Sequence, residues 1–226
     1  LNRRLTQMVR NEDGGVTLRA SDATQGEIEE KSDRVVLAIQ PQVMQNMDLD
    51  LPSDRLEGLR SLPPRFAVKV GGWMRRRFWE EDQGIYGGIS FTNMPNQQVW
   101  YPNNDFHDPN GGLLVMAYAA LQQGEVLGSM DPSARCRLTV ELAKRIHPEI
   151  SDELDPTTLL TIAWQNVPNI YSPWVAWTPE LYKRWFSELT QPCGPVAFAG
   201  DWCSHLPAWQ EGAIRSAYEL LPWATR

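Results

Sequence analysis

The chain has 226 residues, 42% of them hydrophobic and 22% charged, an ordinary globular composition that excludes disorder and suffices for one or two cores. The formal net charge is −7 and the longest basic run is Arg75 to Arg77, so the electrostatic signature of a nucleic-acid-binding protein is missing. No stretch approaches about eighteen apolar residues and no signal peptide is visible, so we expect a soluble chain without a membrane span, with the cytoplasm slightly favoured as its compartment.

The first part of the chain predicts strands. Residues 3–20 alternate apolar and polar side chains around the turn signal Asp13-Gly14-Gly15, which is the pattern of a β-hairpin. Residues 33–39 (DRVVLAI) are a continuous run rich in β-branched side chains that ends at Gln40-Pro41, and this predicts a strand covered on both faces.

The middle of the chain predicts an antiparallel sheet. Residues 66–74 (FAVKVGGWM) form a strand with Lys69 in its interior, and three further strands follow within GIYGGISFTN, QQVWYPN and GGLLVMAYAA. Asn, Pro and Gly turns separate these strands, which favours antiparallel neighbours.

Two helices are expected next. Asp131 with Pro132 begins a helix that ends near residues 147–148 and places Leu138, Leu142 and Ile146 on one face. Residues 161–178 are predicted to be irregular and rich in Trp, after which Thr178-Pro179 caps a short helix that runs to residue 189.

The last predicted unit is a strand, a turn and a helix. Residues 196–199 (VAFA) form a buried strand halted by Gly200, and a helix follows in which Pro207 occupies the first turn. Ala213, Ala217 and Leu221 recur on one face of this helix. A helix that starts just beyond a strand's carboxyl end presents unpaired N–H groups and a positive dipole end, which suit an anion.

The stretch PVAFAGDWCSHLPAWQEGAIRSAY (residues 195–218) resembles the C-terminal flavin motif of the flavin-containing amine oxidases, which include monoamine oxidases and L-amino-acid oxidases. Gly200-Asp201 corresponds to the family's GE pair, Trp209 to its aromatic, and Glu211-Gly212-Ala213 to its EGA. Because Asp201 is shorter than the more usual glutamate, we expect its contact with the ribityl-phosphate region of the cofactor to run through water. The cofactor-binding residues that this resemblance implies are Gly200, Asp201, Trp209, Gln210, Gly212, Ala213 and Ile214.

The resemblance implies an α/β (mixed α+β) fold with a partial, Rossmann-like FAD-binding domain and an antiparallel or mixed-sheet substrate domain. Residues 1–60 and 175–226 would belong to the FAD-binding domain, with an adenine contact near Leu5, and residues 61–174 would form the substrate domain. No GxGxxG follows a predicted strand, although a dinucleotide needs that turn. We therefore expect the N-terminal FAD-binding half to be a missing segment or a separate chain.

Lys69 is the candidate catalytic residue. A lysine between apolar strand neighbours must either reach water or have its charge managed, and an ordinary edge lysine does the former. The segment KVGGWMRRRFW has the same lysine-to-FW spacing as the family segment whose lysine holds a water against flavin N5, so the resemblance implies that role for Lys69.

Tyr118 is a candidate substrate-binding residue. A buried tyrosine usually only satisfies its hydroxyl on a nearby carbonyl. The preceding VWYPN, however, resembles the YYPN stretch of L-amino-acid oxidases, in which the tyrosine of the next strand donates to the substrate carboxylate. This favours an amino acid over a simple amine. The family's paired arginine would lie in the N-terminal half.

The chain has ten tryptophans, and aromatics at that density fill cores or line apolar pockets. Alignment with the family places Trp174 and Trp209 around the substrate, whereas Trp164, Trp177 and Trp185 are assigned to the core. Covalent family members have a cysteine where this chain has Pro173, which implies non-covalent FAD.

Two other features are given no catalytic role. His205 with Ser204 and Asp201 does not form a hydrolase triad, because the three lie in one loop without a nucleophile elbow, and family chemistry needs no strong base there. The three cysteines show no C-x-x-C or metal spacing and are predicted to be free thiols.

The resemblance implies an FAD-dependent L-amino-acid oxidase that forms a 2-keto acid, ammonia and hydrogen peroxide, with dioxygen as second substrate and a large apolar or aromatic amino acid as first. We expect the whole enzyme to be a homo-oligomer. A monoamine oxidase, an amino-acid monooxygenase on the same scaffold, and a non-catalytic subunit or fragment remain alternatives.

Overall fold

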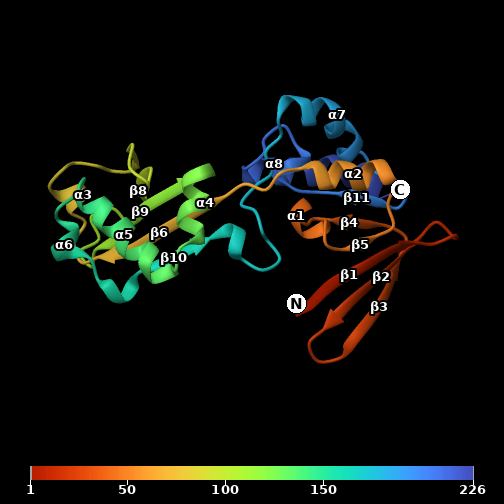
Figure 1. Cartoon of the computed structure of the whole chain (residues 1–226), viewed down its shortest axis with the longest axis horizontal. Helices are drawn as coiled ribbons and strands as arrows, with labels where there is room; N and C mark the ends of the chain where they lie inside the picture. Colours follow the sequence, from red (N-terminus) through yellow and green to blue (C-terminus); the bar gives the residue numbers. More distant parts are fainter. Residues whose placement is uncertain (1, 226) are drawn as a thin grey trace. The chain divides into compact units, whose positions relative to one another are not determined.

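The computed structural model describes residues 2–225, which form two compact units (Figure 1). Within the described residues, the first unit comprises residues 2–64 and 169–225, and the second comprises residues 65–168. Assignment of the first to cofactor binding and the second to substrate binding stays a prediction.

The first unit contains a four-stranded sheet in the order β3-β2-β1-β5 and a parallel pair, β11-β4. Its elements are β1 (Arg3–Arg10), β2 (Val16–Asp22), β3 (Gly26–Ser32), β4 (Val35–Leu37), α1 (Pro41–Met44), β5 (Asp48–Leu49), α2 (Ser53–Ser61), α7 (Pro179–Thr190), β11 (Val196–Phe198), η3 (Asp201–Cys203) and α8 (Gln210–Ala224). The predicted hairpin is confirmed, since β1 and β2 pair antiparallel around the turn at residues 11–15. One core of Met8, Leu59, Leu189, Phe198 and Trp202 joins these elements.

The second unit contains a five-stranded sheet in the order β10-β6-β9-β8-β7, whose pairs are all antiparallel, as predicted. Its elements are β6 (Ala67–Met74), α3 (Phe78–Glu81), β7 (Gly88–Phe91), β8 (Gln98–Tyr101), β9 (Gly112–Ala120), α4 (Leu121–Ser129), α5 (Pro132–Lys144), α6 (Ile150–Glu153), η1 (Pro156–Thr158), β10 (Leu160–Ala163) and η2 (Trp164–Asn166).

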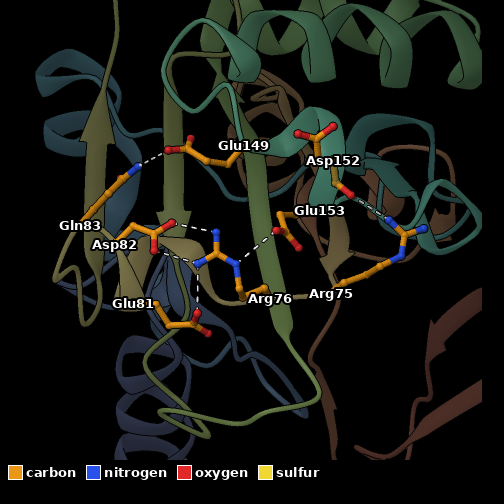
Figure 2. A network of polar contacts seen from close by, with 8 residues as sticks. All are labelled: Arg75, Arg76, Glu81, Asp82, Gln83, Glu149, Asp152 and Glu153. Carbon is orange, nitrogen blue, oxygen red and sulfur yellow. Dashed lines mark hydrogen bonds and ion pairs between the residues drawn. The ribbon is translucent and has the colours of Figure 1, made fainter.

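A surface ion-pair network lies directly after the end of β6 (Figure 2). Arg76 contacts Glu81 at 3.0 Å, Asp82 at 2.8 Å and Glu153 at 3.2 Å, so one guanidinium ties α3 to the end of α6. Hydrogen bonds to these carboxylates raise the pKa of Arg76 further above its ordinary value, which keeps the charge fixed. Nearby, Arg75 donates to the carbonyl of Asp152 at 3.0 Å.

Four expectations about these elements were wrong in detail. The 33–39 strand is shorter, and Val36 is 41% exposed rather than covered on both faces. Residues 161–163, the start of the stretch predicted to be irregular, belong to β10, which pairs with β6 at the edge of the sheet. In α5, Leu138 is exposed, while the small side chains of Thr139 and Ala143 are fully buried and let the helix approach its neighbours closely.

The fourth correction concerns the last helix. It begins at Gln210 instead of near Pro207, because Ala208 has φ of +69° and its N–H donates to the Asp201 carboxylate. Its buried stripe is Gly212, Ser216 and Leu220, one position before the predicted stripe of Ala213, Ala217 and Leu221. The Ser216 hydroxyl accepts the Gly200 N–H at 3.0 Å, which fixes this rotation of the helix.

Candidate functional site

The sheet of the second unit has one face packed against helices and one open face. Val68, Val70, Ala117 and Ala119 point toward α4 and α5 and are fully buried. Strand pairing places the following side chains on the opposite face: Leu160, Ile162, Lys69, Trp73, Leu113, Val115, Tyr118, Trp100, Ile89 and Phe91. A shallow, mainly apolar groove of about 410 Å³ runs over this open face beside Lys69 and Val115.

A β-bulge brings Tyr118 onto the open face. The register between β6 and β9 shifts between Val70 and Gly71, so Val115 pairs with Gly71 and Tyr118 pairs with Lys69. Regular alternation would have placed residue 118 on the helix-covered face with Leu114. Bulges commonly redirect a side chain beside an active site, and this one makes Tyr118 the direct cross-strand neighbour of Lys69.

Lys69 is exposed and lies over aromatic rings. Its Nζ is 4.6 Å from the ring centroid of Tyr118 and 5.9 Å from that of Trp100. Within residues 2–225 no carboxylate forms an ion pair with Lys69. The ammonium therefore keeps N–H donors free above the groove while the rings compensate part of its charge.

Tyr118 is half-buried, and this burial raises the pKa of its phenol above the ordinary value. The hydroxyl, like that of an ordinary tyrosine, is neutral at physiological pH and can donate a hydrogen bond. Trp100 packs against it with ring centroids 5.5 Å apart. Sequence reasoning missed Trp100, although it stands in the same VWYPN stretch. Its pairing with Val115 across β8 and β9 was the missing signal.

The second group of predicted residues lies in the first unit, after β11. Gly200 adopts φ of +153°, and a Cβ there would be 2.9 Å from the Trp202 ring, so only glycine fits. The Asp201 carboxylate accepts the Ala208 N–H at 2.6 Å and so fastens the loop that leads to α8. Burial raises the pKa of Asp201 above the usual range, against the effect of this bond.

The start of α8 is not capped by a side chain. The N–H groups of Gly212 and Ala213 donate to the Trp209 carbonyl at 3.0 and 3.3 Å. The N–H groups of Gln210 and Glu211, the first of the helix, have no intrahelical acceptor, and the helix dipole favours negative charge there. Asp131 and Thr178, by contrast, cap α5 and α7 as predicted.

The remaining members of the predicted set differ in exposure. Ile214 is 51% exposed, and Trp209 is 69% exposed. Trp174 is half-buried, and its carbonyl accepts the Ser172 hydroxyl at 2.7 Å. The described residues show no ring contact between Trp174 and Trp209.

Of the three tryptophans assigned to the core, Trp185 lies in it and Trp177 packs against it, whereas Trp164 is half-buried and lies in no core cluster of the described residues. Trp185 is buried in the core, and the Trp177 indole donates to the Trp202 carbonyl at 2.9 Å. His205 contacts the Tyr182 hydroxyl at 2.8 Å, whereas Ser204 donates to the Asp201 carbonyl. No cysteine pairs with another, and no metal-ligand cluster occurs within residues 2–225.

The fold of the described chain is that of the flavin amine oxidases of known structure. In the described chain, the fold closely matches a putrescine oxidase bound to putrescine, with a TM-score of 0.80 and 21% identity over 100% of this chain and 49% of that one. A cyclohexylamine oxidase from Brevibacterium oxydans matches with a TM-score of 0.71 and 20% identity over 96% and 48%.

The family model for flavin containing amine oxidoreductases matches residues 1–219, and the chain belongs to this family. It is 30% identical over 198 residues to the flavin-dependent L-tryptophan oxidase RebO of Lentzea aerocolonigenes, covering 83% of this chain and 40% of that protein. It is 26% identical over 215 residues to an L-amino-acid oxidase of Siganus canaliculatus, covering 93% and 40%. The chain thus spans less than half the length of these relatives.

Membership in the family implies a flavin cofactor, and the described residues fit one. Gly200 leaves no side chain at the carboxyl end of β11, and the donors at the start of α8 are free for an anionic group. No helix within residues 2–225 has the length and apolar character needed to cross a bilayer.

Proposed function

We propose that the chain is the C-terminal part of an FAD-dependent L-amino-acid oxidase, active together with the half that carries the dinucleotide-binding turn. The observation that carries this proposal is the cross-strand pair of Lys69 and Tyr118 on the open face of the sheet. The similarity to a tryptophan oxidase and to L-amino-acid oxidases supports an amino-acid substrate with a large apolar or aromatic side chain.

Tyr118 would bind the substrate carboxylate. Its phenol is neutral at physiological pH, burial raises its pKa further, and a neutral hydroxyl donates to a carboxylate without repelling it. A simple amine lacks this acceptor, so Tyr118 would distinguish amino acids from amines. The apolar lining of the groove would exclude water from the substrate side chain.

Lys69 would hold a water molecule at the reacting centre. Its ammonium has no carboxylate partner in the described chain, so its N–H groups are available to orient that water. Trp174 and Trp209 would contact the substrate side chain and α-carbon. We assign these roles on the family resemblance together with the exposure of Trp209 and the partial exposure of Trp174.

The first turn of α8 would stabilise negative charge on the cofactor. Bound FAD would supply the acceptor for a hydride, which carries the electron pair of the broken substrate Cα–H bond. The free N–H groups of Gln210 and Glu211 would hold the resulting negative charge, as helix N-termini do. Dioxygen would take up the two electrons and two protons as hydrogen peroxide, and hydrolysis of the imino acid would give the 2-keto acid and ammonia. Pro173, in place of a cysteine, supports non-covalent binding.

The test combines cofactor analysis with product analysis. A flavin that absorbs at about 450 nm and is released from the protein by denaturation would support non-covalent FAD. The protein together with its dinucleotide-binding half is then assayed with L-tryptophan, L-phenylalanine and putrescine for peroxide, keto acid and amide. Keto acid and peroxide from the amino acids are expected, and Tyr118→Phe should raise KM for them. Turnover of putrescine alone, or an amide with carbon dioxide, would refute the proposal.

A further inference from the structure

Trp100 lies on β8, the strand between β7 and β9. It pairs with Val115, is half-buried, and donates from its indole Nε1 to the Gln98 side-chain oxygen at 2.6 Å. Gln98 precedes Trp100 by two residues, so both side chains lie on the same face of β8. The hydrogen bond between them therefore restrains the rotation of the indole ring.

The same indole contacts both members of the proposed catalytic pair. Its centroid lies 5.5 Å from the Tyr118 ring at an interplanar angle of 54°, and 5.9 Å from the Lys69 ammonium. Lys69 in turn lies 4.6 Å from the Tyr118 ring. Three strands, β6, β9 and β8, therefore contribute one side chain each to a compact cluster.

A lysine side chain has four rotatable bonds and on an exposed sheet face would sample many orientations. A carboxylate partner would fix it but would also occupy its N–H donors. Aromatic faces attract the ammonium through their quadrupoles and leave donors available. Two rings, one of them anchored by Gln98, are therefore a means of holding Lys69 in place without neutralising it.

We propose that Trp100 is a positioning residue, which holds the Lys69 ammonium and the Tyr118 ring in their relative orientation and is itself oriented by Gln98. The catalytic meaning of this assignment rests on the proposed function, whereas the contact it describes can be tested on the chain alone.

The experiment measures the reactivity of each lysine in the purified 226-residue chain. A limiting amount of acetic anhydride is added at a single pH, and mass spectrometry gives labelling of Lys69 relative to exposed Lys183. Because the Trp100 ring lies against the Lys69 amino group and restricts its motion, Trp100→Leu should raise the relative labelling about two- to fivefold. Trp100→Phe, which keeps a ring, should give a smaller increase.

Two further variants complete the test. Trp73→Leu changes an exposed tryptophan on the same sheet face that is not in contact with Lys69, and should leave the ratio unchanged. Gln98→Leu removes the anchor of the indole and should act in the same direction as Trp100→Leu, which keeps the inference testable if that variant does not fold.

Gln98→Leu separates positioning from simple shielding, because it keeps the Trp100 ring and removes only the bond that orients it. An increase in labelling for Trp100→Leu with none for Gln98→Leu, or no change in either variant, would overturn the assignment. The labelling needs neither flavin nor substrate, so its failure is distinct from failure of the proposed amino-acid oxidation.

Discussion

His147 should make the stability of the second unit depend on pH. The side chain is 3% exposed, its Nε2 contacts the Tyr101 hydroxyl at 2.6 Å, and its Nδ1 has no hydrogen-bond partner within residues 2–225. Phe78 packs against the ring at 5.4 Å. Burial lowers the pKa of His147 below its ordinary value, although Glu149 acts in the opposite direction.

The sign of the effect follows from linkage. The folded state keeps His147 neutral, while the unfolded chain binds a proton near the ordinary pKa of about 6.5. Stability is therefore full above that pH and is lost as the pH falls below it, with a slope of at most about 1.4 kcal/mol per pH unit. If His147 stays neutral throughout, the loss from about pH 7.5 to about pH 5 is limited to about 2 kcal/mol.

Urea unfolding followed by tryptophan fluorescence measures this loss at several pH values. His147→Gln, which keeps a hydrogen-bonding group for Tyr101 but cannot titrate, should be less stable at neutral pH and nearly independent of pH in this window. His107→Gln is the control, because His107 is exposed. A wild-type chain whose stability is flat between these pH values, or a His147→Gln variant with the full wild-type slope, would refute the reasoning.

Substitutions at three further positions have defined outcomes in the same urea unfolding assay. Gly212→Ala would place a Cβ 2.1 Å from the Leu206 carbonyl oxygen and should destabilise the first unit by about 1–3 kcal/mol or more. Arg135→Met should increase stability by about 1–3 kcal/mol, because Arg135 is buried with two guanidinium nitrogens unpaired and its pKa lowered by burial. Asp131→Ala removes the α5 cap and should cost about 1 kcal/mol, whereas Asp131→Asn should cost much less.

Local signals in the sequence were sufficient for many elements. The hairpin follows from one turn, and α5 and α7 begin where Asp131 and Thr178 provide side-chain caps. The helix α4 was not predicted, because it lacks a side-chain cap and contains Gly124 and Gly128. The carbonyls of these two buried glycines accept hydrogen bonds from the side-chain amides of Gln165 and Asn166 in η2, at 2.9 and 2.8 Å and from about forty residues away.

The candidate site likewise depends partly on local sequence signals and partly on contacts between distant strands. Lys69 and Tyr118 could be selected from the sequence, but their contact depends on the bulge opposite Val70 and Gly71, which shifts Tyr118 to the open face. Strand alternation read along one chain segment does not reveal a bulge, since the extra residue is defined only by the partner strand. Trp100 was missed for the same reason.

The last helix shows which residues bear on cofactor binding. Gly212 and Ser216 of this helix are buried against the rest of the first unit, whereas the side chains of Tyr218 and Leu221 are 68% and 50% exposed. Gly212 is required by the approach of the Leu206 carbonyl, so this glycine of the flavin motif has a packing reason independent of any cofactor. The N–H groups of Gln210 and Glu211 differ from Gly212, because they make no contact that explains them within the described chain: no side chain caps the helix there. The proposal of an anionic group at this helix therefore depends on these two donors and on the loop that Asp201 holds in place.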